Sequence, residues 1–291
     1  MSVLLHGINI LPEFQTYIQQ LVHVLQKQGM RVLITRSLHH CMAKGRRRSS
    51  LPPVLASQQE IASLDFVLSI GGDGTLLDTI SLIGANQTPI LGINTGRMGF
   101  LATIAKEEIE SAVEDLLVGK YSLENRSLVH LESSIPLFDG MNFGLNEFTI
   151  HKRDTSSMIT VHTYIDGDYL NSYWADGLIV STPTGSTGYS LSCGGPLISP
   201  VAKNFVITPV SPHNLNVRPI VVSDDSEISF KIEGRSEKFL VSLDSRSTPI
   251  DASVSLKVKK EKFSARLVKF HNYSFFDTLR QKLNWGYDMR N

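Results

Sequence analysis

One short stretch of the sequence combines glycines with an acidic residue at the point where an apolar run ends. The run Phe66–Ile70 has the length and composition of a buried strand, and GGDGT follows it as residues 71–75. Glycines allow the backbone to turn sharply and to approach a ligand, and amides ahead of a helix can bind phosphate oxygens. The carboxylate of Asp73 would repel a phosphate, so we expect it to accept a proton or to hold a metal ion.

Two common phosphate motifs do not fit this stretch. It lacks the Lys-Ser/Thr ending of a P-loop, and Leu77 stands where the dinucleotide fingerprint GxGxxG requires glycine. An ordinary tight turn between strand and helix, with an acidic cap, is the alternative. The pattern favours a phosphate site of another kind.

A second dense stretch runs from Asp176 to Pro196 and combines glycines with many hydroxyl side chains. Short hydroxyl groups and glycine amides can form several hydrogen bonds to a polar ligand such as a ribose or a base edge. The alternative is an ordinary Ser/Gly-rich loop. In either case the composition predicts a loop rather than a helix.

Four further sites carry little information when taken singly: Asn146–Glu147, Asp176, Asp244 and His213. An Asn-Glu pair at the start of a strand is most often solvated. His213 lies between prolines, and we expect it to have a structural role through backbone hydrogen bonds.

Composition excludes several classes of protein. The chain has 291 residues, is 42% hydrophobic and has a formal net charge of zero, so it can form more than one core and has no general attraction to nucleic acid or membranes. The one basic cluster, Arg46–Arg48, is expected to be a solvated loop, with a place near an anionic ligand as the alternative. Two distant cysteines, no apolar stretch of membrane-spanning length and no signal-type N-terminus predict a reduced, cytoplasmic location. The neighbours His39, His40 and Cys41 are not expected to bind a metal, because adjacent side chains rarely converge on one ion.

The first part of the chain alternates between strand and helix patterns, which indicates a parallel sheet. The expected strands are 3–6, 30–35, 66–70 and 89–94, and the expected helices are 12–28 and 106–119. Residues 95–100 form a second glycine-bearing loop after a strand. Because parallel α/β sheets bind ligands at the carboxyl ends of their strands, we expect this loop and GGDGT to face one crevice.

From about Tyr121 the pattern changes to short alternating stretches separated by turn residues, which predicts a β-sandwich. The expected strands are 127–132, 147–151, 160–165, 177–181, 228–232, 239–243 and 254–258. A hairpin is expected at 166–168, and helical spacing returns at 274–286. The predicted fold is therefore α/β plus all-β: a Rossmann-like N-terminal domain followed by a β-sandwich C-terminal domain.

The order of the motifs resembles that of the NAD kinase family. GGDGT is followed by Asn-Glu, Asp-Gly with TPTGSTGYSLSCGGP, SPHNLNVRP, LDS and FFDTLRQKLNWG, from about residue 64 to 286. The long Thr/Gly/Ser motif is specific to that family, whereas GGDGT also occurs in diacylglycerol-type lipid kinases and phosphofructokinases.

The resemblance implies a reaction and a set of site residues. Such enzymes transfer a phosphoryl group from ATP, or in some cases polyphosphate, to the 2′-hydroxyl of the adenosine ribose of NAD, and they need a divalent cation such as Mg²⁺. Asp73 matches the general base, and the phosphate-binding positions are Gly71, Gly72, Gly74 and Thr75. The NAD-binding positions implied are Asp73, Gly74, Asn146, Glu147, Trp174, Asp176, Thr187, Gly188, Tyr189, Ser190, Leu191, Ser192 and Arg246.

At three of these positions the residue differs from the one that is common in the family or present in some of its members. Gly188 stands where the family commonly has Ala, and Arg246 where it often has Gln. Trp174 occupies a place that some members fill with a polar or basic residue, so it could stack on a ring of the ligand or simply be packed. No set of metal ligands in the chain is predicted, because the nucleotide phosphates are expected to carry the ion.

The resemblance also implies domains and partners. Residues 1–121, joined by the C-terminal segment 271–291, are expected to bind the phosphate donor, and the β-sandwich 122–270 is expected to bind NAD. NAD and ATP are the expected partners, with no nucleic acid and no membrane, in a homodimer or homotetramer. The alternatives are a lipid kinase of the diacylglycerol or sphingosine type and a non-catalytic dinucleotide sensor.

Overall fold

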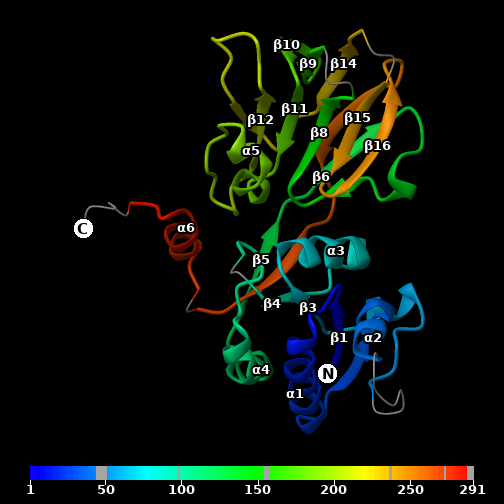
Figure 1. Ribbon diagram of the computed structural model, residues 1–291, viewed down its shortest axis with the longest axis vertical. Helices are drawn as coiled ribbons and strands as arrows, with labels where there is room; N and C mark the ends of the chain where they lie inside the picture. Colours follow the sequence, from blue (N-terminus) through cyan, green and yellow to red (C-terminus); the bar gives the residue numbers. More distant parts are fainter. Residues whose placement is uncertain (44–50, 97–98, 154–156, 236–237, 272, 287–291) are drawn as a thin grey trace. The chain divides into compact units, whose positions relative to one another are not determined.

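The computed structural model describes residues 1–43, 51–96, 99–153, 157–235, 238–271 and 273–286. The basic cluster Arg46–Arg48 lies outside them, as do two residues of the second glycine loop. The chain divides into two compact units, residues 1–125 with 265–291 and residues 126–264 (Figure 1). Each unit is described by itself.

The first unit is built on one sheet. Its six strands have the order β2-β1-β3-β4-β18-β5, and β1 to β4 pair in parallel. β18 also pairs in parallel with β4. The strands are β1 Ser2–Gly7, β2 Arg31–Ile34, β3 Phe66–Gly71, β4 Ile90–Asn94, β5 Ser122–Arg126 and β18 Ala265–Lys269.

Helices cover both faces of this sheet, as a continuous apolar strand composition requires. The α-helices are α1 Gln15–Lys27, α2 Arg36–Ala43, α3 Asp73–Ile83, α4 Ile109–Leu117 and α6 Phe275–Leu283, and the short 3-10 helices are η1 Pro12–Phe14, η3 Gln58–Ser63, η4 Gly84–Asn86 and η5 Lys106–Glu108. One core joins apolar side chains of α1, α2 and α4 to alternate residues of the strands, such as Val3 and Leu68. The intervening residues Leu4 and Val67 are equally buried, on the opposite face.

The second unit is a β-sandwich of two six-stranded sheets, with orders β10-β9-β14-β17-β6-β7 and β13-β12-β11-β8-β15-β16. Both sheets contribute to one core, in which Phe148, Phe205 and Phe239 are fully buried. The first sheet consists of β6 Val129–Ser133, β7 Phe143–Gly144, β9 Ile159–Ile165, β10 Asp168–Ala175, β14 Ile228–Glu233 and β17 Leu256–Lys260. The second consists of β8 Glu147–Lys152, β11 Gly177–Ser181, β12 Asn204–Val210, β13 Ile220–Ser223, β15 Lys238–Leu243 and β16 Arg246–Asp251. The unit also contains η6 Phe138–Gly140, η7 Thr184–Thr187 and α5 Tyr189–Ser192.

The predicted fold class is confirmed, and three details of the sequence prediction differ. Residues 265–269 form a strand of the first unit, although they were expected in the sandwich, because β18 pairs with β4. The Thr/Gly/Ser tract was expected to be a loop but includes two short helical turns, η7 and α5. Helix α2 was not expected. No helix in the described part of the chain is long and apolar enough to cross a membrane.

Candidate functional site

The GGDGT stretch is a tight turn from β3 into α3. Strand β3 ends at Gly71, and α3 begins at Asp73. A Cβ atom on Gly71 would lie 2.2 Å from Oγ1 of Thr75, so only glycine allows the helix to begin so close to the strand. Gly72 and Gly74 are exposed, with open space where a Cβ would be. Their amides are therefore accessible at the start of the helix, as a phosphate site requires.

The carboxylate of Asp73 is held by backbone amides at the end of the second glycine loop and directly after it. Oδ2 accepts from the amide of Phe100 at 2.9 Å, and Oδ1 accepts from Leu101 at 3.1 Å and Ala102 at 3.2 Å. A Cβ on Gly99 would lie 1.8 Å from Oδ1, which explains the glycine there. A carboxylate has about four lone-pair sites, so these bonds leave one on Oδ2 for a further donor. Asp73 thus links two segments that the sequence could only place at one edge of the sheet.

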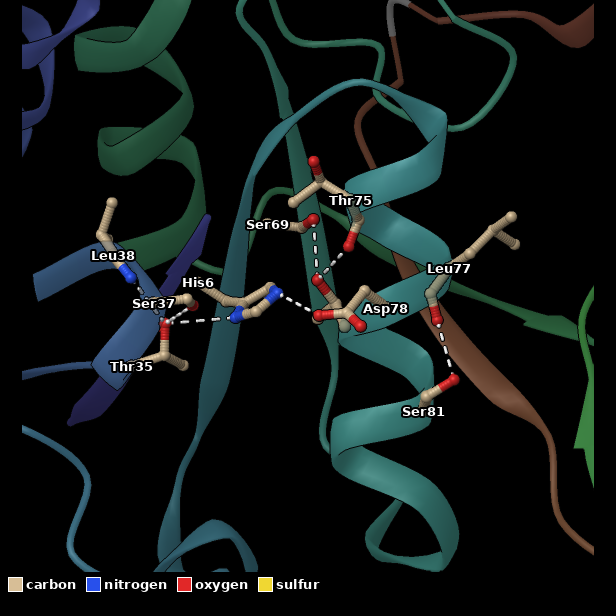
Figure 2. Close-up of polar contacts among 10 residues, drawn as sticks. His6, Thr35, Ser37, Leu38, Ser69, Thr75, Leu77, Asp78 and Ser81 are labelled. Carbon is tan, nitrogen blue, oxygen red and sulfur yellow. Dashed lines mark hydrogen bonds and ion pairs between the residues drawn. The ribbon is translucent and has the colours of Figure 1, made fainter. Parts of the chain in front are cut away.

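Helix α3 is fixed to the sheet by polar side chains that no sequence motif revealed. Figure 2 shows His6 of β1 between Thr35 and Asp78: Nδ1 lies 3.2 Å from Thr35 Oγ1, and Nε2 lies 2.8 Å from Asp78 Oδ2. On the same helix, Thr79 donates to Ser69 of β3 at 2.8 Å. The partners are far apart in sequence and follow no spacing rule, so only the fold could show them.

A cavity of about 180 Å³ opens beside the second glycine loop, at the carboxyl end of β4. The amide of Thr95 donates to the carbonyl of Gly71 at 3.3 Å, so the two glycine loops are in contact. The cavity is lined by Phe14, Asn94, Thr95, Gly96, Thr103, Ala105 and Glu107. Its place follows the general rule for ligand sites in parallel α/β sheets.

In the second unit, the Asn146–Glu147 pair is organised around Asp244. Asp244 Oδ2 accepts from the amide of Leu145 at 2.8 Å, and Oδ1 accepts from Asn146 at 2.7 Å and Glu147 at 3.2 Å. Oε2 of Glu147 is buried and has no hydrogen-bond partner among the described residues. Burial first, and the nearby Asp244 second, raise the pKa of Glu147 to about 8. This carboxyl group is therefore mostly protonated at neutral pH, and its Oε2 has unused hydrogen-bonding capacity.

The Thr/Gly/Ser tract packs directly on this pair. The amide of Thr182 donates to the carbonyl of Asn146 at 2.8 Å. A Cβ on Gly185 would lie 2.1 Å from the same carbonyl, and one on Gly188 would lie 3.4 Å from Glu147 Oε2. The structure thus brings together Asn146, Glu147 and Gly188, which the resemblance had assigned to one site.

Other positions implied by the resemblance have protein partners. Tyr189 is 40% exposed and stacks on His151, with ring centroids 5.6 Å apart. Ser190 is buried and bonds Thr208 Oγ1 at 2.8 Å. Thr187 donates to the carbonyl of Thr184, Leu191 is half-buried and Ser192 is exposed. Only the exposed members of the set can reach a ligand without rearrangement.

Asp176, Trp174 and Arg246 also lie in protein contacts. Asp176 pairs with Lys152 at 2.6 Å, and the Trp174 ring packs on His213 at 4.2 Å while remaining 43% exposed. The guanidinium of Arg246 donates to the carbonyls of Met141 and Phe143. A ligand contact at Arg246 therefore stays a prediction.

The described residues contain no group of three His, Cys, Asp or Glu side chains placed to hold a metal ion. His39, His40 and Cys41 lie on α2, as part of an ordinary amphipathic helix.

Comparisons with known proteins give the family. A model of the ATP-NAD kinase N-terminal domain matches residues 9–121, and one of the ATP-NAD kinase C-terminal domain matches residues 145–270. An NAD kinase of Cytophaga hutchinsonii is 52% identical over 99% of both chains. The chain belongs to the NAD kinase family. It is accordingly an enzyme that transfers a phosphoryl group to NAD.

Further relatives agree with this family assignment. An NAD kinase of Flavobacterium psychrophilum is 44% identical over 94% of both chains. Among solved structures, an Archaeoglobus fulgidus NAD kinase in complex with ATP is 26% identical, with a TM-score of 0.77 over 98% of this chain and 99% of that one. Yeast NADH kinase complexed with NADH has the same fold, with a TM-score of 0.89 over 100% of this chain and 89% of that one, at 21% identity.

Proposed function

We propose that the chain transfers the γ-phosphoryl group of ATP to the 2′-hydroxyl of the adenosine ribose of NAD, with Asp73 as general base. The 2′-oxygen attacks the γ-phosphorus, the bond from that phosphorus to the ADP oxygen breaks, and the hydroxyl proton passes to Asp73 Oδ2. NADP and ADP are the products. The observation that carries this role is the carboxylate at the start of α3, whose bonds to three amides orient it while one lone pair stays available.

The phosphate donor is assigned to the first unit. Accessible amides at Gly72 and Gly74 and the neighbouring cavity at the end of β4 suit a polyanionic ligand. Because phosphoryl transfer depends mainly on positioning and charge neutralisation, oriented amides at this turn contribute directly. Polyphosphate in place of ATP would present phosphate oxygens of the same kind to these backbone amides.

The dinucleotide is assigned to the second unit. Asn146 offers a donor and an acceptor to an adenine edge, and Glu147 offers a buried oxygen without a protein partner to ribose hydroxyls. Tyr189 and Trp174 present exposed aromatic surface in the same unit. The other assigned positions are Asp176, Thr187, Gly188, Ser190, Leu191, Ser192 and Arg246.

A divalent cation such as Mg²⁺ is expected to arrive with the nucleotide phosphates. The described residues do not by themselves offer a ligand set for it. We further propose a cytoplasmic homodimer or homotetramer.

The test is NADP formation from NAD, ATP and Mg²⁺, measured with an NADP-specific dehydrogenase. Asp73→Asn should lower kcat by about 10²–10⁴-fold, the usual contribution of a general base, while NAD still binds. Asp115→Asn on α4 is the matched control and should leave kcat unchanged. Wild-type protein that binds NAD but forms no NADP with any phosphoryl donor would instead support a dinucleotide sensor. A lipid kinase is disfavoured, because both family models and the relatives are NAD kinases.

A further inference from the structure

Asp244 lies in a turn whose backbone conformation is unfavourable for most residue types. It follows β15 and has a φ of 50°, a left-handed conformation that Asp and Asn tolerate better than most residues. Its own amide donates to the carbonyl of Glu147 at 3.0 Å. Backbone and side chain of this one residue therefore both bind the start of β8.

The carboxylate is enclosed by that segment. Three consecutive amides, those of Leu145, Asn146 and Glu147, donate to it at 2.7 to 3.2 Å. A Cβ on Gly144 would lie 3.0 Å from Oδ1, so any larger residue there would crowd the carboxylate. Consecutive amides that all point to one acceptor fix the backbone, and with it the directions in which the next side chains leave.

We propose that Asp244 is the positioning residue for the dinucleotide site: it fixes the Asn146–Glu147 backbone so that both side chains face the ligand. This inference rests on the proposed function, because it takes these two side chains to bind NAD. Asp244 acts through its neighbours and needs no contact with the ligand.

The hydrogen bonds from the backbone amides also affect the ionisation of Asp244 and Glu147. Burial raises the pKa of Asp244, and the three amide donors and the guanidinium of Arg246 oppose that shift. Glu147 has no hydrogen-bond donor on its buried Oε2, and burial together with the neighbouring Asp244 raises its pKa. The phenol of Tyr189 is also close enough to be affected by the charge of Glu147, which contributes to the raised pKa of Tyr189 after burial.

The first test is Asp244→Asn, which keeps the shape and the turn but replaces one acceptor by a donor that opposes an amide N–H. The KM for NAD should rise by about tenfold or more, and the KM for ATP should stay within about twofold. Asp224→Asn is the matched control: Asp224 is also buried and bonded, but to Lys260 and Ser127 rather than to residues 145–147. It should leave both KM values within about twofold.

The second readout is the pH dependence of kcat/KM for NAD. Removing the charge of Asp244 takes away a repulsion that disfavours ionised Glu147, so the inflection near pH 8 should move to lower pH. Gly144→Ala displaces the carboxylate while keeping its charge. This variant should raise the KM for NAD without moving the inflection to the same extent, which a general loss of stability would not reproduce.

Hydrogen exchange separates this inference from the proposed function. Amides 145–147 should exchange at least about tenfold faster in Asp244→Asn than in wild type, and should not in Asp224→Asn. If the wild type forms no NADP, the proposed function fails, but the exchange result still decides whether Asp244 holds the segment. Wild-type exchange together with a wild-type KM for NAD in Asp244→Asn would overturn the inference. If that variant does not fold, a wild-type KM for NAD in Gly144→Ala overturns it.

Discussion

The carboxyl group of Glu147 makes the stability of the protein depend on pH. Its pKa is about 8 in the folded chain and 4.5 in an unfolded reference, so the folded state binds more protons between these values. The contribution of Glu147 to the free energy of unfolding therefore falls as pH rises from 4.5 to 8, by on the order of 1 kcal/mol per pH unit, and it is fully lost above pH 8.

Glu147→Gln removes this titration, so its free energy of unfolding should decline less than that of the wild type between pH 5.5 and 8. Urea unfolding at both pH values measures the difference. Glu227→Gln, which changes a partly exposed carboxylate paired with Lys257, should keep the wild-type pH dependence. Parallel pH curves for wild type and Glu147→Gln would show that Glu147 is not protonated in the folded state.

For individual residues, the sequence alone showed which residue types could take part in the chemistry better than it showed what each residue does. Asp73 could be singled out because an acid among phosphate-facing amides needs a reason. Asn146 and Glu147 could not be singled out from their own neighbourhood, because what distinguishes them is burial and the carboxylate of Asp244, 97 residues away along the chain for Glu147. Such contacts depend on tertiary structure and leave no local pattern.

At the scale of elements, α3 determines where Asp73 lies, and hydrogen bonds from its side chains attach the helix to the sheet. Thr79 is fully buried and donates to Ser69, so Thr79→Val leaves the hydroxyl of Ser69 without this partner at almost unchanged volume. We expect a loss of about 1–3 kcal/mol in the free energy of unfolding, measured with urea.

Ser81→Ala is the control for this prediction. Ser81 lies on the same helix but donates only to the carbonyl of Leu77, one turn earlier (Figure 2). It should change the free energy of unfolding by no more than about 0.5 kcal/mol. Equal losses in both variants would mean that the link from Thr79 to the sheet is unimportant.

Two glycines in the helical turns of the Thr/Gly/Ser tract, Gly185 and Gly188, should differ in how well they tolerate substitution by alanine. Gly185→Ala places a Cβ 2.1 Å from the carbonyl of Asn146, which is backbone and cannot move freely. Gly188→Ala meets its nearest atoms at 3.2 and 3.4 Å, a contact that a small shift relieves. We expect Gly185→Ala to destabilise the protein by at least about 2 kcal/mol, and Gly188→Ala by less than about 1 kcal/mol.

Thermal unfolding of the two glycine variants, followed by circular dichroism, gives the comparison. A tract with the freedom of a flexible loop would accept both substitutions equally, and that result would contradict the close packing on Asn146.

Elements that form continuous apolar runs were predictable, and β3, β4 and β11 lie within a residue of their expected bounds. Among the elements that were not predicted, β12 and α2 were missed for different reasons. β12 contains Pro209, which argues against a strand in sequence. α2 is short and carries His39 and His40, which weaken its helical pattern. Both elements form because they pack against the rest of the fold, although the local sequence does not favour them.

At the scale of the whole molecule, the first unit depends on residues that follow the second unit in the chain. β18 lies between β4 and β5 in the order of the first sheet, and its Leu267 and Val268 are buried, as is Phe270. Burial of side chains of this size contributes about 2 kcal/mol each, so these three contribute about 6 kcal/mol. That amount is comparable to the net stability of a typical domain, about 5–15 kcal/mol. The sequence pattern placed this segment in the sandwich because a short strand does not reveal which sheet it joins.

A pair of truncations tests this dependence. A chain that ends at residue 264 lacks β18 and should lose the fold of the first unit, while the second unit keeps its own core. A chain that ends at residue 273 keeps β18 and lacks residues 274–291, which include α6, whose contacts include Phe275 with Phe100 at 6.4 Å between ring centroids. Limited proteolysis with mass spectrometry should find cuts within residues 1–125 of the shorter chain only. Equal resistance of that region in both chains would show that the sheet is stable without β18, because the two chains differ by the strand and the few residues after it.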